Sequence, residues 1–474
     1  MERVDVLVIG AGLLGCFTAR NLTRYEMDIL VLDKENDVSR GISKANTGII
    51  YTGYDNKPGS LKSKLCIQSN EAFDALARQL AVPFSRPGSL MIGYGPRADQ
   101  VIRRKYTDGI RAGIKGLRLL NGCEAKELEP RLADGISSAL FSRSTGTVNP
   151  WELCIAAYEN ARDNGAGFQF GSEVHSIKRD HGAFLVETDS GLYSARAVVN
   201  AAGLSSDRVR EFIQKPLLRL YPTAADYMVL DTSESGKIRH IIFHEGENGK
   251  GLTLVPTVDG NILVGPTNHE PKYGVISDTG FRVSTDGLME LRSLCRMVAP
   301  SILTEKQIRA FGSLRPNVYR VHEEEGRIIR EDTRIRDFSL LEEDGFLSLI
   351  GIKTPGLTFS NELGRLAADK AAAFTGRTEL RKSYSPYRVG IARTRDLSAG
   401  ERAALIRKDP CRGEVVCGCM DVTLSEILQA IEQGAHDFEG IRRRTGAGMG
   451  RCQGSRCRKK IWDCLYERSF REKH

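Results

Sequence analysis

The sequence has no apolar run long enough to cross a bilayer, no internal repeat and no low-complexity tract. It also has no basic stripe interleaved with aromatic residues, so we expect no nucleic acid as a partner. The net charge of +8 is a small excess of 68 basic over 60 acidic residues in 474. Only two residues precede the first expected strand, which leaves no room for a cleavable signal, and we therefore expect a cytoplasmic protein.

The 11 cysteines are an odd number, which argues against a secreted disulfide framework. Five are scattered through apolar or helical surroundings and are expected to be small buried hydrophobes: Cys16, Cys66, Cys123, Cys154 and Cys295. The other six crowd into residues 411–474, and this shift in composition indicates a separate C-terminal module.

A glycine-rich turn lies close to the N-terminus. An apolar run leads into Gly10-x-Gly12-x-x-Gly15, a helical pattern follows, and a second apolar run ends at Asp33. This order of strand, turn, helix, strand and acid predicts a dinucleotide site. Gly10 allows the tight turn, and Gly12 lets backbone N–H groups approach a pyrophosphate. Gly15 lets the helix pack closely on the strand, and Asp33 can accept hydrogen bonds from a ribose.

The rest of the chain alternates strand and helix patterns. A buried strand pattern at 197–200 ends in the small-residue turn Ala201-Ala202-Gly203, and another at 346–350 leads through a glycine turn into a helix. Between 215 and 330 the periodicity is mostly two, which indicates an antiparallel sheet that closes over a cofactor and forms a substrate cavity. The segment 376–410 has no strong periodicity and is interpreted as a linker.

Taken in order, these motifs resemble those of flavin-dependent oxidases and dehydrogenases of the glycine oxidase and D-amino-acid oxidase type, over nearly the whole chain. Within that superfamily the chain is similar to anaerobic, multi-subunit glycerol-3-phosphate dehydrogenases and to L-2-hydroxyglutarate oxidases. The motifs that carry the resemblance are the N-terminal glycine turn, Asn46-Thr47-Gly48 through Cys66, Gly146 to Pro150, Asn200 to Gly203, Leu314-Arg315-Pro316 and Gly351 to Thr358.

The resemblance implies an α/β fold with three parts. These are a doubly wound, Rossmann-like FAD-binding domain, an antiparallel-sheet substrate domain, and a small helical domain with four cluster cysteines at the C-terminus. The FAD-binding domain is expected to be discontinuous, at 1–85, 146–214 and 331–375. The remaining parts are the substrate or cap domain, the linker and the [2Fe–2S] domain, expected at 86–145 with 215–330, at 376–410 and at 411–474.

The resemblance also identifies the dinucleotide as FAD. Asp33 corresponds to the acid that binds the adenosine ribose, the loop from Ser43 to Tyr51 is expected to pass under the flavin, and Gly356-Leu357-Thr358 to approach its pyrimidine edge. The expected FAD contacts are Gly10, Gly12, Leu13, Leu14, Gly15, Asp33, Lys34, Ser43, Asn46, Thr47, Gly48, Ile49, Val174, Ala201, Ala202, Gly203, Gly351, Gly356, Leu357 and Thr358.

Five residues are candidates to act on the substrate. Arg315 would bind its acidic group, because a guanidinium pairs bidentately with carboxylate or phosphate; a structural salt bridge is the alternative. Lys353 corresponds to the lysine of a Gly-Gly-Lys turn in glycerol-3-phosphate dehydrogenases, where 2-hydroxyglutarate enzymes tend to have an acidic residue, and this favours a phosphorylated substrate. A surface lysine is the simpler alternative. Tyr51 stands where many relatives have a histidine. Tyr51, Tyr227 and His269 are candidate bases, each with packing as the alternative.

The C-terminal module contains Cys417-Gly418-Cys419 and Cys452-x-x-x-x-Cys457, two close pairs that can take zinc or a [2Fe–2S] cluster. A Cys-x-Cys pair suits tetrahedral zinc less well. The segment resembles the bacterioferritin-associated ferredoxin domain, down to the run 448–454, which implies a [2Fe–2S] cluster with zinc as the alternative. Cys417, Cys419, Cys452 and Cys457 would be the ligands, and nearby basic residues would favour the reduced cluster or dock an acidic partner.

The resemblance implies an FAD enzyme that oxidises a small anionic secondary alcohol, first of all glycerol 3-phosphate to dihydroxyacetone phosphate. Electrons would pass through the cluster to an acceptor protein, additional subunits or a quinone, and such partners could hold the protein at the inner face of the membrane. An L-2-hydroxy acid, or an amine or amino acid, is the alternative substrate. A non-catalytic electron-transfer subunit is the alternative of another class; the intact Leu314-Arg315-Pro316 motif argues against it.

Overall fold

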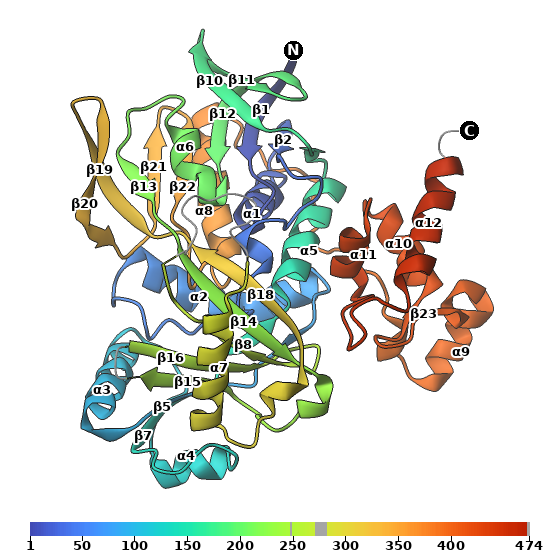
Figure 1. The fold of residues 1–474 in the computed structure, drawn as a ribbon. Coiled ribbons are helices and arrows are strands. Elements are labelled where there is room, and N and C mark those ends of the chain that lie inside the picture. The colour runs from blue at the N-terminus through green and yellow to red at the C-terminus, as the bar shows by residue number, and fades with distance from the viewer. Residues whose placement is uncertain (247–248, 271–281, 472–474) are drawn as a thin grey trace. The chain divides into compact units, whose positions relative to one another are not determined.

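The computed structural model describes residues 1–246, 249–270 and 282–471. Positions 271–281 and 472–474, which fall within the predicted substrate and cluster domains, lie outside the described residues. The chain divides into two compact units, Met1–Tyr387 and Arg388–His474, and each is considered by itself (Figure 1).

The first unit contains a sheet whose five central strands are all parallel. In spatial order they are β9 (Gly167–Gln169), β2 (Ile29–Leu32), β1 (Glu2–Ile9), β12 (Gly191–Asn200) and β22 (Phe346–Ile350). The sheet is completed by antiparallel strands, namely β21 (Ser339–Glu343) beside β22 and the hairpin β10 (Val174–Asp180) and β11 (Ala183–Thr188) beside β12. Helices cover the parallel strands, and burial on both faces explains their continuous apolar runs. The predicted doubly wound arrangement is confirmed.

Helices with well-defined ends cover this sheet. They are α1 (Leu13–Leu22), α2 (Leu61–Gln79), α5 (Pro150–Asp163) and α8 (Ser360–Thr375). The Asn149 side chain accepts a hydrogen bond at the start of α5, and α8 ends at Gly376 in the left-handed conformation. Helix α1 packs between α5 and α8 (Figure 1). None of the described helices is both long and apolar enough to span a bilayer.

The second sheet of this unit has eight strands. In order they are β18 (Gln307–Arg315), β14 (Thr223–Leu230), β17 (Ile262–Val264), β16 (Gly249–Pro256), β15 (Ile241–Gly246), β5 (Ser89–Gly93), β7 (Ser138–Ser142) and β6 (Leu117–Asn121). Neighbouring strands are antiparallel, as predicted, with one correction: β15 and β5 are parallel. This pair joins the two separate chain segments of the sheet.

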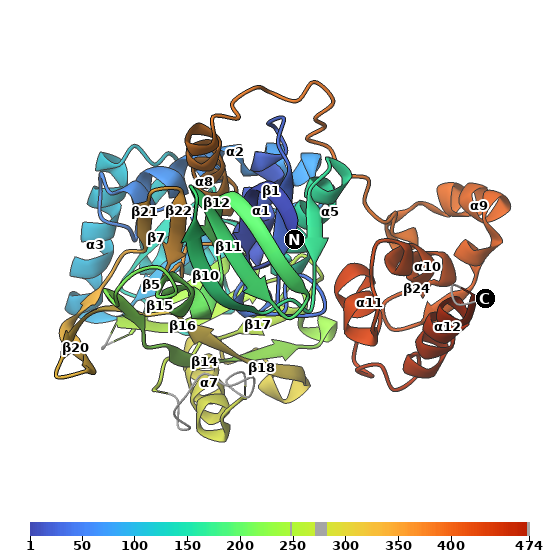
Figure 2. The same cartoon turned by 90° about the horizontal axis from the view of Figure 1, so that it is seen from above.

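Shorter elements complete the unit. Helices α3 (Gly95–Arg111), α4 (Gly122–Leu128) and α7 (Thr285–Val298) cover the second sheet, and α7 lies against β14 (Figure 2). Two small sheets are formed by β13 (Leu218–Leu220), β19 (Val318–Glu324) and β20 (Arg327–Ile335), and by β3 (Ile49–Ile50), β8 (Gly146–Val148) and β4 (Phe84–Ser85).

The second unit is a small, mainly helical domain. It contains α9 (Ala399–Lys408), β23 (Val415–Cys417), β24 (Val422–Thr423), α10 (Leu424–Glu432), α11 (Phe438–Thr445) and α12 (Arg458–Arg471). Its core includes Ile427, Ile441 and Ile461, all fully buried. Helix α9 lies inside the stretch 376–410 that was interpreted as a linker. None of its residues is buried, so it has no apolar face to detect, and a capping box of Ser398 and Glu401 marks its start.

The contact between α1 and α8 generates a stability prediction at Gly364. An added Cβ there would lie 2.8 Å from the carbonyl carbon of Phe17 and 2.9 Å from the amide nitrogen of Thr18. Although alanine favours helix by about 1 kcal/mol, the overpacking is larger. We therefore expect Gly364→Ala to lower the free energy of unfolding of the first unit by about 1–2 kcal/mol.

Urea unfolding followed by the fluorescence of Trp151, in a Trp462→Phe background, would measure this change in the first unit alone. Gly41→Ala, in the same unit, is the matched control, because nothing lies within 4 Å of the added Cβ and the φ of Gly41 is −83°. An unchanged midpoint for Gly364→Ala would show that the two helices can separate at no cost.

Candidate functional site

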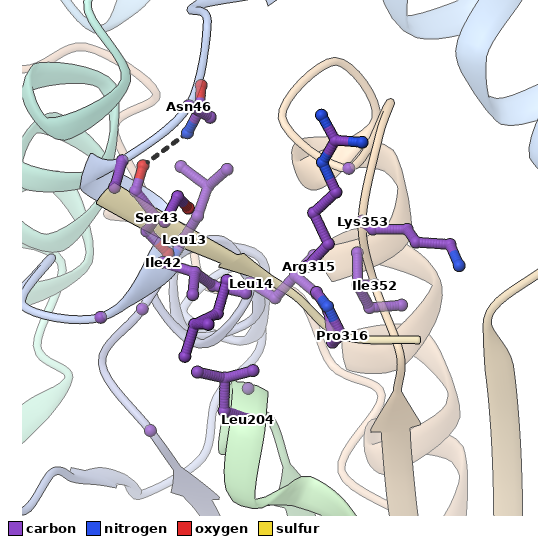
Figure 3. Close-up of a pocket in the computed structure, with 18 of the residues that line it drawn as sticks. Leu13, Leu14, Ile42, Ser43, Asn46, Leu204, Arg315, Pro316, Ile352 and Lys353 are labelled. Atoms are coloured by element: carbon purple, nitrogen blue, oxygen red, sulfur yellow. Dashed lines mark hydrogen bonds between the residues drawn. The ribbon is translucent and has the colours of Figure 1, made fainter. Parts of the chain in front are cut away.

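A cavity of about 690 Å³ in the first unit is lined by residues from both large sheets. It extends from the turn after β1 and the end of β2 to the end of β18 and the turn after β22. Figure 3 shows Leu13, Leu14, Ser43 and Asn46 on one side of it, and Arg315 and Lys353 on the other. The N-terminal glycine turn and the residues expected to bind the substrate therefore line the same cavity.

Backbone contacts shape the nucleotide end of the cavity. Gly10 has a φ of 105°, and a Cβ there would lie 2.6 Å from the carbonyl oxygen of Ala201, so the turns after β1 and β12 touch. The Asp33 carboxylate accepts hydrogen bonds from the Ala11 N–H at 2.5 Å and the Glu35 N–H at 2.9 Å. Burial raises the pKa of Asp33, and these two hydrogen bonds oppose the rise. Asp33 thus stabilises the turn as well as facing the cavity.

The start of α1 is suited to an anion. Its N-cap is Gly12, which offers no side-chain cap, and its first turn has no acidic residue. The Leu13 N–H is bound by the Ser43 hydroxyl at 2.9 Å, which ties the loop before β3 to the helix. Helix N-terminal N–H groups with no side-chain cap are the usual partners of phosphate.

The loop after Ser43 is held by its own asparagine. The Asn46 side chain donates to the Ser43 carbonyl at 2.8 Å (Figure 3) and accepts from the Gly48 N–H at 2.9 Å. The chain then passes through β3 to Tyr51, whose N–H donates to the Thr358 hydroxyl at 2.9 Å. This bond joins the loop to the turn after β22.

Most of the predicted nucleotide contacts line the cavity, and four do not. A Cβ at Gly15 would lie 1.7 Å from the Gly10 carbonyl oxygen, at Gly48 2.4 Å from the Val148 carbonyl oxygen, and at Gly351 1.9 Å from a Val318 methyl carbon. Thr358 instead binds the Tyr51 backbone. These residues shape the walls of the cavity from behind. The predicted contacts found in the lining are Gly10, Gly12, Leu13, Leu14, Asp33, Lys34, Ser43, Asn46, Thr47, Ile49, Val174, Ala201, Ala202, Gly203, Gly356 and Leu357.

Three cations meet at the opposite end of the cavity. Arg315, at the end of β18, Arg334, on β20, and Lys353, after β22, all line it. Burial, together with the nearby charges of Arg334, Lys62 and Arg315, lowers the pKa of Lys353 from 10.5 to about 8. The opposing influence of Asp337 does not balance this positive charge. This end of the cavity, called the anion site below, therefore suits a negatively charged group.

Two tyrosines lie beside the cations. Burial raises the pKa of both Tyr51 and Tyr227 to about 12, although Arg315, which hydrogen-bonds to Tyr227, acts in the opposite sense. A pKa of about 12 keeps both phenols protonated near neutral pH, a state that suits a hydrogen-bond donor better than a base.

His269 is not among the residues that line the cavity. Its Nε2 is 3.7 Å from the buried Asp226 carboxylate, and its Nδ1 is 3.3 Å from the Thr267 hydroxyl. Its backbone pairs with Ala224, which turns the neighbouring Asn268 toward the cavity. The structure thus brings Tyr51, Arg315 and Lys353 together and leaves His269 outside.

Sequence reasoning missed Arg334, Asn317 and Asn268. Arg334 lies on β20, a strand whose residues are almost all exposed. The sequence pattern of this strand is typical of a solvent-exposed hairpin. Asn268 follows a strand end in an irregular stretch. Asn317 is 3% exposed and lies only two residues after Arg315. Of the three missed residues, it is the one that a sequence signal, its position beside the Leu-Arg-Pro motif, could have indicated.

In the second unit the four predicted cluster cysteines form two contacting pairs. The Cys452 thiol is hydrogen-bonded to Cys419, and the Cys457 thiol to Cys417. The Gly448 N–H points at the Cys417 sulfur at 3.4 Å. A Cβ at Gly450 would lie 2.5 Å from the Cys419 Cβ, so the two loops approach closely. Across the described residues, no three His, Cys, Asp or Glu side chains are already arranged to hold a single metal ion.

Electrostatics differ between the two pairs. Burial opposes ionisation of Cys452, but hydrogen bonds from the Arg456 backbone, the Cys419 thiol and the Gly454 backbone lower its pKa to about 7. Burial and the neighbouring Cys417 raise the pKa of Cys457 to about 12. Backbone N–H donors toward sulfur are the second-shell contacts that iron–sulfur sites use.

Comparison with known proteins decides the family. Residues 5–370 match the FAD dependent oxidoreductase family. The chain belongs to that family. Residues 415–467 match the BFD-like [2Fe-2S] binding domain, so this FAD-dependent oxidoreductase also carries an iron–sulfur module.

Individual relatives of this oxidoreductase cover most of its length. The glycerol 3-phosphate dehydrogenase of Caloramator mitchellensis is 32% identical, over 97% of this chain and 93% of its own. One subunit of the anaerobic glycerol-3-phosphate dehydrogenase of Escherichia coli is 24% identical over 96% of this chain and 86% of its own. Dithionite-reduced L-alpha-glycerophosphate oxidase of Mycoplasma pneumoniae with FAD bound has a TM-score of 0.72 at 23% identity, covering 82% of this chain and 99% of the other, and confirms the fold.

The site geometry fits both cofactors of the oxidoreductase. The start of α1, which lacks a side-chain cap, and the Gly10–Ala201 contact form a cradle that side chains would fill, as a pyrophosphate site requires. Asp33 lines the same end of the cavity as this turn, where its carboxylate would accept hydrogen bonds from the adenosine ribose of FAD. Four thiols on two touching loops supply the ligand number that a [2Fe–2S] cluster needs.

The cysteine pairs generate a prediction on the ligand set. We expect Cys419→Ser to abolish the sulfide-to-iron absorption and the EPR signal of the reduced cluster, because one of four thiolate ligands is lost. The FAD content stays unchanged, since the two units are separate. Visible spectroscopy, EPR and iron analysis measure this, with Cys411→Ser as the matched control. A wild-type protein with stoichiometric zinc and no such absorption would contradict the cluster itself.

Proposed function

We propose that the protein oxidises glycerol 3-phosphate to dihydroxyacetone phosphate. The observation that carries the proposal is the convergence of Arg315, Arg334 and Lys353 at one end of the cavity. Three cations offset a dianionic phosphate, whereas the carboxylate of an amino acid calls for one. The glycerol 3-phosphate dehydrogenases among the relatives support the same substrate.

The roles of the residues follow from their positions. Arg315, with its planar fork, and Lys353, as a point charge, would bind phosphate oxygens, and Arg334 would complete the set from β20. The protonated phenols of Tyr51 and Tyr227 would donate hydrogen bonds to substrate oxygens. These bonds would orient the substrate so that the carbon that is oxidised faces the cofactor. When bound, FAD would supply the two-electron acceptor for the hydride of the secondary alcohol, and the proton of the substrate hydroxyl would pass to solvent.

We further propose that electrons leave through the [2Fe–2S] domain to a partner protein or a quinone. The similarity to one subunit of an anaerobic enzyme supports additional subunits. Cys452 is only half-buried, and Arg451 and Arg456 beside it are exposed, which leaves one edge of the cluster loop open to an acidic acceptor. Partners of this kind would place the protein at the inner face of the membrane.

A substrate panel tests the proposal. We expect glycerol 3-phosphate to bleach the flavin absorption of the anaerobic protein, and L-2-hydroxyglutarate and proline to do so at least 100-fold more slowly. In Arg315→Met the loss of a charge-assisted bond of about 1.5–3 kcal/mol lowers the second-order rate of bleaching 10- to 150-fold while FAD is retained.

Arg320→Met is the matched control, because Arg320 is exposed on the next strand and does not line the cavity. Normal reduction of Arg315→Met would remove Arg315 from the site. If L-2-hydroxyglutarate alone bleaches the flavin, the enzyme is a 2-hydroxy-acid dehydrogenase, and if only a reduced partner protein does, it is an electron-transfer subunit.

The pKa of Lys353 generates a pH prediction. In the free enzyme this pKa lies at about 8, below the ordinary value of 10.5, so the ammonium that binds phosphate is lost as the pH rises above about 8. We expect kcat/KM for glycerol 3-phosphate to fall above that pH, by up to tenfold per unit. The profile of kcat/KM between pH 6 and 10 measures the descending limb.

Two variants assign that limb to Lys353. Lys353→Gln is expected to lower kcat/KM at pH 7 by 10- to 150-fold and to remove the limb, because the side chain no longer titrates. Lys353→Arg keeps the charge at every pH of the assay and moves the limb out of range. A limb that persists near pH 8 in both variants would belong to another group.

A further inference from the structure

Asn317 is the common partner of two of the three cations. Its Oδ1 accepts a hydrogen bond from Lys353 Nζ at 2.9 Å and one from Arg334 Nη1 at 3.4 Å. Its backbone is fixed on both sides, because its N–H donates to the Arg315 carbonyl at 2.9 Å and its carbonyl accepts from the Tyr221 N–H at 2.8 Å. The side chain is thereby held, almost fully buried, under the anion site.

The other side of the Asn317 amide leads to the third cation. Asn317 Nδ2 donates to the Thr223 hydroxyl at 3.1 Å, and this hydroxyl donates to Asn268 Oδ1 at 3.1 Å. The same Asn268 oxygen accepts from Arg315 Nη1 at 3.4 Å. Thr223 opens β14 and is paired in register with Arg315 on β18, so the sheet itself sets this spacing.

We propose that Asn317, Thr223 and Asn268 form an amide relay that sets the spacing of the three cations and selects a phosphate over a carboxylate. The proposal rests on the proposed function. Every hydrogen bond that the relay makes to a cation ends on a neutral amide oxygen. The three residues are positioning residues, since they act through the cations.

The neutrality of the relay is its physical advantage. Like charges repel, and the acceptors of the relay hold the three cations near one another against that repulsion. Aspartates at 268 and 317 would accept the same hydrogen bonds, but each would cancel one positive charge before the substrate arrived. An amide oxygen holds the cation through a dipole and does not neutralise it. The positive charge of the cation therefore stays available to the incoming anion. A site with three fixed cations matches a tetrahedral dianion better than a planar monoanion.

Asn317→Asp tests the neutrality of the relay, since it keeps the shape and the acceptor and adds one negative charge. We expect the KM for glycerol 3-phosphate to rise at least 30-fold with kcat within threefold of wild type. The dissociation constant of inorganic phosphate, measured by flavin difference spectra on the oxidised holoenzyme, rises by a similar factor. The descending limb of the pH profile moves up by at least one unit, because the new carboxylate favours the charged form of Lys353.

Thr223→Val and Thr223→Ser test the spacing. Valine keeps the volume and removes the hydroxyl, so the link between Asn317 and Asn268 is lost, and we expect KM and the phosphate dissociation constant to rise five- to 20-fold. Serine keeps the hydroxyl and is expected to restore both within twofold. A merely structural role for Thr223 predicts equal effects of the two variants and would overturn the proposal.

The phosphate measurement separates this proposal from the proposed function. If glycerol 3-phosphate does not reduce the wild type, yet phosphate binds and Asn317→Asp weakens it at least 30-fold, the relay stands and the substrate assignment fails. If glycerol 3-phosphate reduces the wild type and Asn317→Asp leaves KM, phosphate affinity and the pH limb within twofold, the relay is overturned and the substrate assignment stands.

Discussion

The contact between the turn after β1 and the turn after β12 is the constraint on which the site depends. Gly10 touches the Ala201 carbonyl, and Gly15 lies against Gly10, so the backbone of α1 starts directly at the carboxyl edge of the parallel sheet. Any side chain at these two positions would push the helix away. Gly12 offers no side-chain cap, and apart from the Leu13 N–H, which donates to the Ser43 hydroxyl, the N–H groups of the first turn suit the FAD pyrophosphate.

Positive charge at the far end of the cavity is the second organising feature. Arg315 is half-buried and Arg334 is exposed, and the hydrogen-bond partners of the cations here include the amide oxygens of Asn268 and Asn317. Burial, and after it the repulsion from the neighbouring cations, lowers the pKa of Lys353. A site of this kind is poised for an anion, because an incoming phosphate relieves the repulsion that the fold maintains. The strands β18, β20 and β22 each contribute one cation or the turn that carries it.

The chain combines two redox modules, an FAD-binding unit and an iron–sulfur unit, which have different structural requirements. The first unit keeps a long cavity for FAD and substrate, and its residues are matched to binding and orientation. The second unit is far smaller, and its short β-hairpin and helices bring two cysteine loops together. Its core of Ile427, Ile441 and Ile461 is independent of the first unit's core. Two-electron chemistry and one-electron transfer are thus held by separate folds on one polypeptide.

Local sequence alone determined the nucleotide turn, Asp33, the strand patterns and the cysteine pairs, because their physics acts over a few neighbouring residues: glycine where no Cβ fits, and apolar runs where a strand is buried. The family resemblance of two short motifs pointed to Arg315 and Lys353. Only the tertiary structure showed which residues lie next to those motifs. Asn268, Arg334 and Thr223 lie far from Lys353 in the chain, and only strand pairing brings them together. In the sequence, His269 was as good a candidate as the other residues. The β-bridge to Ala224 places His269 beside Asp226 and outside the cavity lining. Strand register decides which side chains reach a cavity, and no local pattern encodes that register.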